Sequence, residues 1–206
     1  MTEKDTYKTI TKPSEEVLFK EKNSKFLGYA YPIKNAEDVK FHLENLKKQH
    51  HSARHWCYAY QLGKQESQYQ FRVNDDGEPN NSAGMPIYGQ IQSFEVTNIL
   101  IVVVRYFGGV KLGVGGLISA YKTTAQMALE QSIIVSKTIN QEIQLKFEYK
   151  DMNKVMRVIK ENDLKITNQT LELDCSINIS VRLKNIKRTI QTFEAIYGVE
   201  IKNLDD

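Results

Sequence analysis

Apolar residues in the first two thirds of the chain alternate between the period of a strand and that of a helix. A two-residue period, or a continuous apolar run, predicts strands at 17–19, 27–33, 55–62, 69–74 and 99–104. Spacings of three and four residues predict helices over 36–49, with Asn35 as N-cap, over 82–93, and from Gly116 onward. These elements predict an α+β fold, in which helices cover one face of an antiparallel-rich sheet.

After about Lys137 the alternation produces a second, shorter series of elements. A strand with apolar residues at every second position up to Tyr149 is followed by a helix and by strands over 164–170 and 171–181. Every second residue from Leu171 and Leu173 onward is apolar, which predicts one buried face. A helix with Tyr197 on its apolar side and a final strand complete the order β-α-β-β-α-β, typical of a ferredoxin-like domain. We therefore divide the chain into domains 1–137 and 138–206.

Composition limits the class of protein. Hydrophobic residues make up 41% and charged residues 26% of the 206 residues, as in ordinary globular proteins, and the net charge is +3. Domain 1–137 holds 17 Lys and Arg against 14 Asp and Glu, whereas 138–206 holds 11 of each, so the surplus lies in the first domain. No signal-peptide core precedes Thr6, and Cys57 and Cys175 form no CxxC pair. We expect a cytoplasmic monomer with reduced thiols, no membrane association and no cofactor.

A glycine-rich turn joins the apolar strand at 99–104 to the next helix. Arg105, Tyr106 and Phe107 precede it, and no Asp or Glu occurs between Val96 and Leu129. Backbone N–H groups in such a turn can bind an anion, and exposed rings beside cations suit RNA. The predicted phosphate or nucleic-acid site comprises Arg105, Tyr106, Gly108, Gly109, Lys111, Gly113, Gly115, Gly116 and Lys122.

Alternative interpretations of this turn stay open. Neither the P-loop pattern nor the dinucleotide-binding fingerprint is present, because Leu112 follows Lys111 and Ile118 occupies the last glycine position. The glycines could instead allow tight helix packing, and Arg105 could pair with Asp75 or Asp76. We expect Phe107 to be a core residue.

A polar segment and a histidine cluster are the other candidates for chemistry. Asp-Gly followed by Pro79 is typical of a turn, and the acidic residues lack EF-hand spacing, so we expect turn chemistry rather than a metal site. His55 and Cys57 share one strand face, but Ser52 provides no orienting carboxylate, which favours a buried, structural thiol with a hydrogen-bonded histidine. Possible contributors to the site from these segments are Asp75, Asp76, Glu78, Ser82, Gly84, His50 and His55.

Three ordered motifs resemble the YigZ/IMPACT family: RYFGGVKLGVGGLISAY from Arg105, NDDGEPNNSAGMPI from Asn74, and HHSARHWCYAY from His50. The resemblance implies an N-terminal domain similar to domain IV of elongation factor G and to a small-subunit ribosomal protein, and a C-terminal domain similar to domain V. It also implies a link to translation, since eukaryotic members regulate the kinase pathway of translation initiation by competing for an activator protein. Ser119 and Asn81 depart from the family pattern.

We therefore expect a translation-associated regulator that binds RNA, the ribosome or a translation-related protein through its glycine-rich, basic face. Binding is expected rather than catalysis, and no catalytic or metal-binding residue is assigned. One alternative is an enzyme or binding protein for a small phosphorylated ligand in the same cleft. Another is a protein-interaction module without a nucleic-acid ligand.

Overall fold

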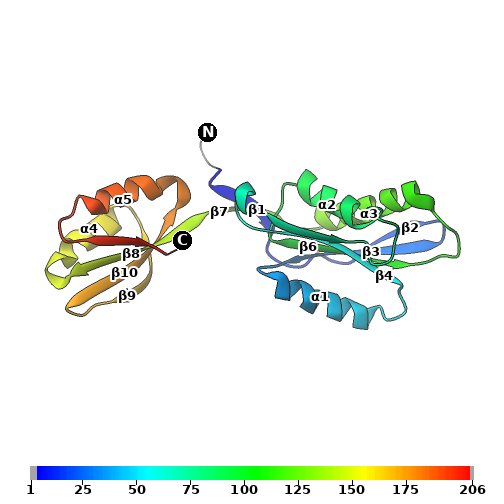
Figure 1. Cartoon of the computed structure of the whole chain (residues 1–206), viewed down its shortest axis with the longest axis horizontal. Helices are drawn as coiled ribbons and strands as arrows, with labels where there is room; N and C mark the ends of the chain where they lie inside the picture. The colour runs from blue at the N-terminus through cyan, green and yellow to red at the C-terminus, as the bar shows by residue number, and fades with distance from the viewer. Residues whose placement is uncertain (1–3, 205–206) are drawn as a thin grey trace. The chain divides into compact units, whose positions relative to one another are not determined.

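The computed structural model describes residues 4–204, which form two compact units, each built from α and β elements (Figure 1). The N-terminal unit comprises residues 7–137. The C-terminal unit comprises residues 138–204 together with residues 4–6. Across the described residues, no helix combines the length and apolar character that a membrane span requires.

A five-stranded antiparallel sheet forms the centre of the N-terminal unit, in the order β2-β3-β6-β4-β5. Its strands are β2 (Val17–Glu21), β3 (Ser24–Pro32), β4 (His55–Leu62), β5 (Gln70–Asn74) and β6 (Ile99–Tyr106). The helices are α1 (Ala36–Gln49), α2 (Gly84–Ser93) and α3 (Gly113–Glu130), with a 3-10 turn at η1 (Glu66–Gln68). Helix α1 begins as predicted, because the side chain of Asn35 accepts a hydrogen bond of 2.9 Å from the Asp38 N–H.

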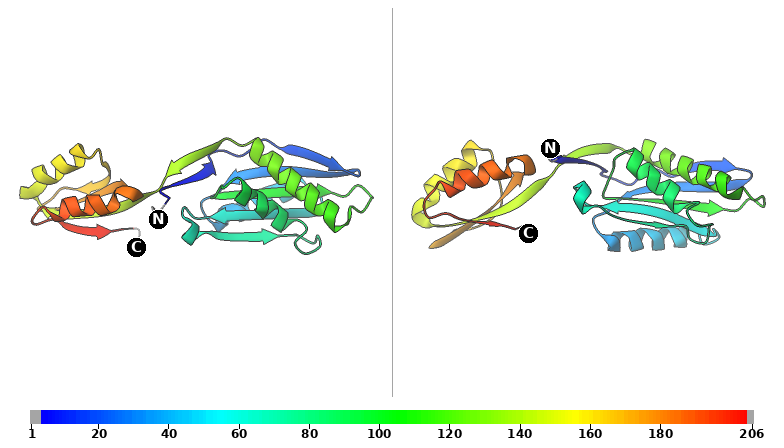
Figure 2. Two further views of the ribbon diagram at one scale, coloured as in Figure 1. Left: turned by 90° about the horizontal axis from the view of Figure 1, so that it is seen from above. Right: turned by 45° about the horizontal axis from the view of Figure 1, so that its top comes forward.

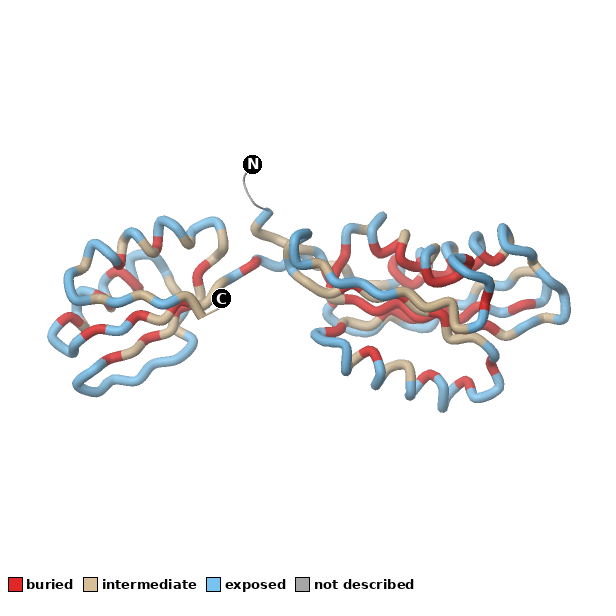
Figure 3. Tube along the Cα trace, in the orientation of Figure 1, coloured by how far each residue is buried: buried red, intermediate tan, exposed pale blue. Residues whose placement is uncertain are grey.

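Helices cover both faces of this sheet, so the expectation of helices on one face is wrong. Helices α2 and α3 lie on one face and α1 on the other (Figures 1 and 2). The continuous apolar run of β6 explains this arrangement: alternate residues enter different cores, Val103 facing α2 and α3 and Val104 facing α1. Every residue of β6 from Ile99 to Arg105 is buried. Figure 3 shows the central strands of the sheet in the colour of buried residues.

Two short strands were missed by the sequence pattern, and one helix begins earlier than expected. Strands β1 (Thr6–Ile10) and β7 (Ile134–Thr138) pair with each other in a separate two-stranded sheet. Helix α3 begins at Gly113, three residues before the predicted start, so most of the glycines that follow Lys111 belong to its first turn.

The C-terminal unit contains β8 (Asn140–Glu148), α4 (Met152–Glu161), β9 (Lys165–Thr170), β10 (Asp174–Arg182), α5 (Ile186–Glu194) and β11 (Glu200–Asn203). Short 3-10 turns precede both helices, at η2 (Tyr149–Asp151) and η3 (Leu183–Asn185). The predicted element order is present, and the antiparallel sheet has the order β11-β8-β10-β9. Asp5 contributes to this unit, since its carboxylate accepts a hydrogen bond of 2.6 Å from Arg182 Nε.

Four apolar residues assigned to this core by their spacing are exposed instead. Leu171 and Leu173 lie in the loop between β9 and β10, before the strand begins, and Tyr149 follows the end of β8. Tyr197 lies beyond the end of α5. The apolar spacing continues past the ends of the elements, and the spacing alone does not mark where the backbone leaves the sheet or helix.

Candidate functional site

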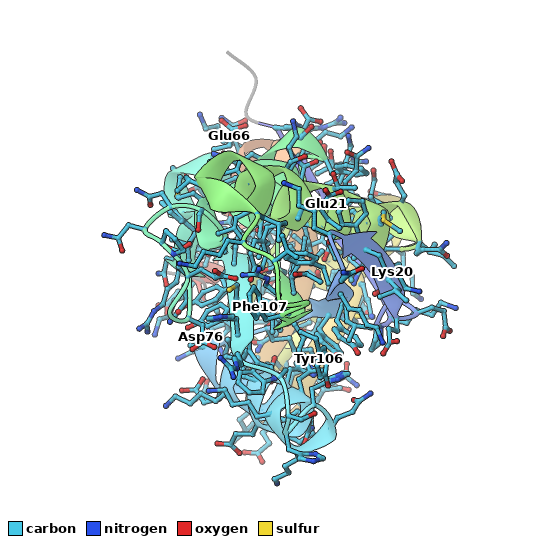
Figure 4. The ribbon with its side chains drawn as sticks, turned by 90° about the vertical axis from the view of Figure 1, so that its right-hand side faces the viewer. Lys20, Glu21, Glu66, Asp76, Tyr106 and Phe107 are labelled. Atoms are coloured by element: carbon cyan, nitrogen blue, oxygen red, sulfur yellow. The ribbon has the colours of Figure 1, made fainter. Side chains whose placement is uncertain are left out.

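The predicted site lies where β6 leaves the sheet, at the end of the N-terminal unit viewed in Figure 4. Strand alternation sends Arg105 toward α2 and α3, and Tyr106 toward the face that α1 covers. Phe107 follows outside the strand with 44% of its surface exposed, so the expectation that it is a core residue is wrong.

Arg105 belongs to a buried polar network. Its guanidinium Nη1 donates to Glu78 Oε1 at 2.6 Å, and the Tyr121 hydroxyl donates to the same oxygen at 2.8 Å. The guanidinium carbon also lies 5.4 Å from the ring centre of Phe26 and 5.5 Å from that of Phe107. Arg105 and Glu78 are buried. The carboxylate that pairs with Arg105 is therefore Glu78, not Asp75 or Asp76, and the pair ties the acidic loop to the end of β6.

The two aspartates of this loop hold the backbone in place. The Asp75 carboxylate accepts hydrogen bonds of 2.8–2.9 Å from the N–H groups of Asn81, Ala83 and Gly84, at the start of α2. The Asp76 carboxylate accepts one of 2.7 Å from the Trp56 N–H. This is the turn chemistry predicted for the segment, and it occupies both carboxylate oxygens of Asp75 and one of Asp76 with backbone donors.

The same loop fixes Ser82 and Gly84. The Ser82 hydroxyl is buried and donates to the Pro79 carbonyl at 2.6 Å. A Cβ on Gly84 would lie 2.8 Å from the backbone nitrogen of Asn74. Ser82 therefore fixes the loop internally, and Gly84 allows its close packing against β5.

Cys57 is buried beneath this loop, but its hydrogen-bond partner is not a histidine. Its thiol donates to the Asp75 carbonyl at 2.9 Å and lies 3.3 Å from the Tyr121 hydroxyl oxygen. Burial raises the pKa of the Cys57 thiol above its usual range, so the thiol stays protonated near neutral pH. His55 shares the strand face, as expected, but its Nδ1 is 2.8 Å from the Asp76 carbonyl oxygen and its Nε2 is 4.0 Å from Glu78 Oε1.

His50 lies on the opposite face of the sheet from His55. Its Nε2 is 2.6 Å from the Tyr29 hydroxyl oxygen, and its Nδ1 is 3.0 Å from that of Tyr106. The Tyr29 hydroxyl donates its own proton to Glu16, so it accepts from His50 Nε2–H. In neutral His50, Nδ1 then accepts from Tyr106. Burial lowers the pKa of His50, which favours this neutral form.

An open groove of about 500 Å³ lies beside this histidine. It is lined by Leu18, Asn23, Lys25, Leu27, His50, Tyr106 and Phe107. The sequence pattern did not predict the residues that β2, β3 and their turn contribute to this groove. The two turns touch at Gly108, where a Cβ would lie 2.1 Å from the backbone carbon of Asn23, and the local sequence pattern carries no signal for this contact.

The remaining glycines surround the start of α3. Gly109 and Gly113 have positive φ, which favours glycine, whereas a Cβ on Gly115 would meet open space in an ordinary helical turn. Leu112 provides no side-chain cap, and the first turn contains no acidic residue, so its N–H groups face outward without a side-chain acceptor. Lys111 lies in the turn, but Lys122 is nine residues into the helix, roughly 13 Å along its axis.

Comparison with known proteins identifies the family. Residues 22–129 match the Impact N-terminal domain. The chain belongs to the IMPACT family. It is 33% identical to an IMPACT family member of Haemophilus influenzae over 89% of this chain and 88% of the relative. It is 35% identical to the IMPACT family member YigZ of Escherichia coli over 71% and 72% of the two chains.

Fold similarity extends beyond the matched IMPACT domain. A crystal structure of a hypothetical protein has a TM-score of 0.72 and 28% identity, covering 96% of this chain and 97% of that one. Within this chain, the IMPACT segment contains every predicted site residue and the groove residues Asn23 and Lys25, whereas Leu18 precedes it.

Proposed function

We propose that this IMPACT family member is a translation-associated regulator that binds single-stranded RNA at the end of β6. The family resemblance implies the link to translation, and the expected likeness of its two domains to elongation factor G domains IV and V, the latter ferredoxin-like, belongs to the same proposal. The single-stranded RNA that it binds could be a segment of ribosomal RNA.

The observation that carries this proposal is the exposed Phe107 ring beside a groove and an uncapped helix start. Aromatic rings bind unpaired bases by stacking, and this mode does not depend on base sequence. Lys20, Lys22 and Lys25 are exposed on the β2–β3 hairpin, and Lys111 is exposed in the glycine turn. These cations suit the phosphates that accompany a stacked base.

Within the proposal, the residues around the end of β6 take distinct roles. Phe107 stacks on a base, and Lys25, Lys111 and the N–H groups of the first turn of α3 bind phosphates. Arg105 is a positioning residue, because its charge is already paired with Glu78 and its guanidinium lies against Phe107. Gly115 leaves the first helical turn free of a side chain that would block a phosphate.

The test measures binding of a labelled oligouridylate by fluorescence anisotropy. Phe107→Ala should weaken binding roughly tenfold, because stacking on one ring contributes about 1–3 kcal/mol per base. The matched control is Phe41→Ala, since Phe41 is also an exposed phenylalanine of the N-terminal unit. Lys25→Ala and Lys111→Ala should each reduce the slope of log affinity against log salt by about 0.7.

Equal affinities of wild type, Phe107→Ala and Phe41→Ala would overturn the proposal. The groove volume also suits a mononucleotide, which is the alternative of a small phosphorylated ligand. Saturable thermal stabilisation by uridine monophosphate, without affinity for the oligouridylate, would favour that alternative.

A further inference from the structure

Three loops meet at one end of the C-terminal unit, the left end in Figure 1. Strand β8 ends there while β10 and β11 begin there, because Asp174 pairs with Glu148 and Glu200 pairs with Lys146. The Tyr149 N–H donates to the Leu173 carbonyl at 3.3 Å. Since β8 lies between β10 and β11, the loop after β8 lies between the other two loops.

These loops carry four exposed apolar side chains, which we call the apolar tip: Tyr149, Leu171, Leu173 and Tyr197. Leu173 and Tyr197 are 89% and 94% exposed. The core of this unit is complete without them, since it is built from other residues of β8, β10, α4 and α5. Single exposed apolar residues are normal in proteins, but four on adjoining loops mark a contact surface.

Loop chemistry does not explain the apolar tip. The hairpin loop between β9 and β10 is Leu171-Glu172-Leu173, whereas short hairpin loops favour Gly, Asn and Asp. Tyr197 precedes Gly198, whose positive φ belongs to the turn between α5 and β11. The fold needs a turn residue at these places and does not need leucine or tyrosine.

Acidic residues surround the apolar tip. Glu172 and Asp174 flank Leu173, and Glu194 and Glu200 bracket the loop that carries Tyr197. None of the four forms an ion pair within residues 4–204. Two further acids at this end are neutralised locally, Glu148 by Lys150 at 2.9 Å and Asp151 by Lys154 at 2.8 Å. The tip therefore combines exposed apolar area with an excess of negative charge.

We propose that the apolar tip binds a basic, apolar segment of a partner protein. Exposed leucine and tyrosine side chains gain free energy by leaving water, and tyrosine is enriched among the residues that dominate protein interfaces. The acidic rim selects a partner of opposite charge. The same rim repels nucleic acid, anionic lipid and the identical tip of a second copy, because all three carry negative charge. This inference goes beyond the RNA site proposed for the N-terminal unit.

Two labelled helical peptides test it with the full chain, one of leucine and lysine and one of leucine and glutamate. Anisotropy should show saturable binding of the lysine peptide and none of the glutamate peptide. The double variant Leu173→Ser/Tyr197→Ser should lose roughly tenfold or more in affinity for the lysine peptide. The matched control, Phe41→Ser/Ile133→Ser, replaces exposed apolar residues outside the tip and should stay within twofold of wild type.

Charge is tested separately with Glu172→Lys/Glu194→Lys, which should also bind the lysine peptide about tenfold more weakly. Oligouridylate affinity should be unchanged in the Leu173→Ser/Tyr197→Ser variant, so that failure at the tip is distinguished from failure of the RNA site. Equal affinity for the two peptides would overturn the proposal, as would wild-type binding by the tip variant. Self-association of wild type that the tip variant abolishes, measured by sedimentation, would also overturn it by making a second copy the occupant.

Discussion

At the scale of single residues, the Arg105–Glu78 pair decides how the end of β6 is used. The sequence pattern suggested Asp75 or Asp76 as the partner of Arg105, and the structure shows that the partner is Glu78. In the structure, turn geometry commits Asp75 and Asp76 to backbone N–H groups, and Glu78 is left to accept from both Arg105 and Tyr121. A guanidinium bonded in this way shapes the site through its position rather than through a free charge.

Replacing Glu78 by glutamine should lower the free energy of unfolding by about 3 kcal/mol, because Arg105 would keep its charge in a buried place without a counter-charge. Chemical denaturation followed by circular dichroism measures this. Glu95→Gln is the matched control, since it removes the same charge from the exposed Lys8–Glu95 pair and should cost less than about 1 kcal/mol. Equally small decreases in the free energy of unfolding for the two variants would show that the buried pair contributes no more to stability than the exposed one.

At the scale of elements, the sequence predicted the parts with strong periodicity and missed those without it. The capped helix α1 and the apolar strand β6 follow from local pattern, because their own residues determine their form. Strands β1 and β7 are five residues each, three of them polar, and only pairing between distant segments makes them strands. The exposure of Leu173 and Tyr197 could not be derived from apolar spacing either, because the spacing continues past the ends of the elements.

The site shows the same division between local and distant information. The glycine turn and the start of a helix after it were predictable, since glycine and the absence of acids are visible in the sequence. The groove was not, because Lys25 and Asn23 reach it through the contact between two turns that are about eighty residues apart.

Two glycines of this turn should respond to alanine in opposite ways. Gly108→Ala should destabilise the N-terminal unit, because its Cβ would lie 2.1 Å from the Asn23 backbone carbon. Gly115→Ala should stabilise it by about 0.5–1 kcal/mol, because the new methyl meets open space in a helix. If phosphate approaches this first turn, Gly115→Ala should nevertheless weaken oligouridylate binding. Higher stability with unchanged RNA affinity would place the phosphates elsewhere.

At the scale of the whole molecule, the two units have separate cores, but the chain does not divide at a single point. The two cores on either face of the five-stranded sheet contain only residues of the N-terminal unit, and the core of the C-terminal unit contains only residues from β8 onward. Residues 4–6 nevertheless belong to the C-terminal unit. The Asp5 carboxylate accepts a hydrogen bond from Arg182, and the Asp5 backbone carbonyl accepts one of 2.8 Å from the Ile139 N–H. The predicted boundary between residues 137 and 138 is the hypothesis that residues 138–206 fold without the rest of the chain.

That hypothesis predicts a cooperative thermal transition for the fragment 138–206, because the fragment keeps the whole four-stranded sheet and its core. The fragment should melt at a lower temperature than the same unit in the full chain, since it lacks the bonds to Asp5. Arg182→Ala separates this cause from others: it should lower the melting temperature of the C-terminal transition in the full chain and have little effect in the fragment, where its partner is absent. Equal effects in both would show that Arg182 acts through contacts within 138–206, and a fragment without a cooperative transition would refute the division itself.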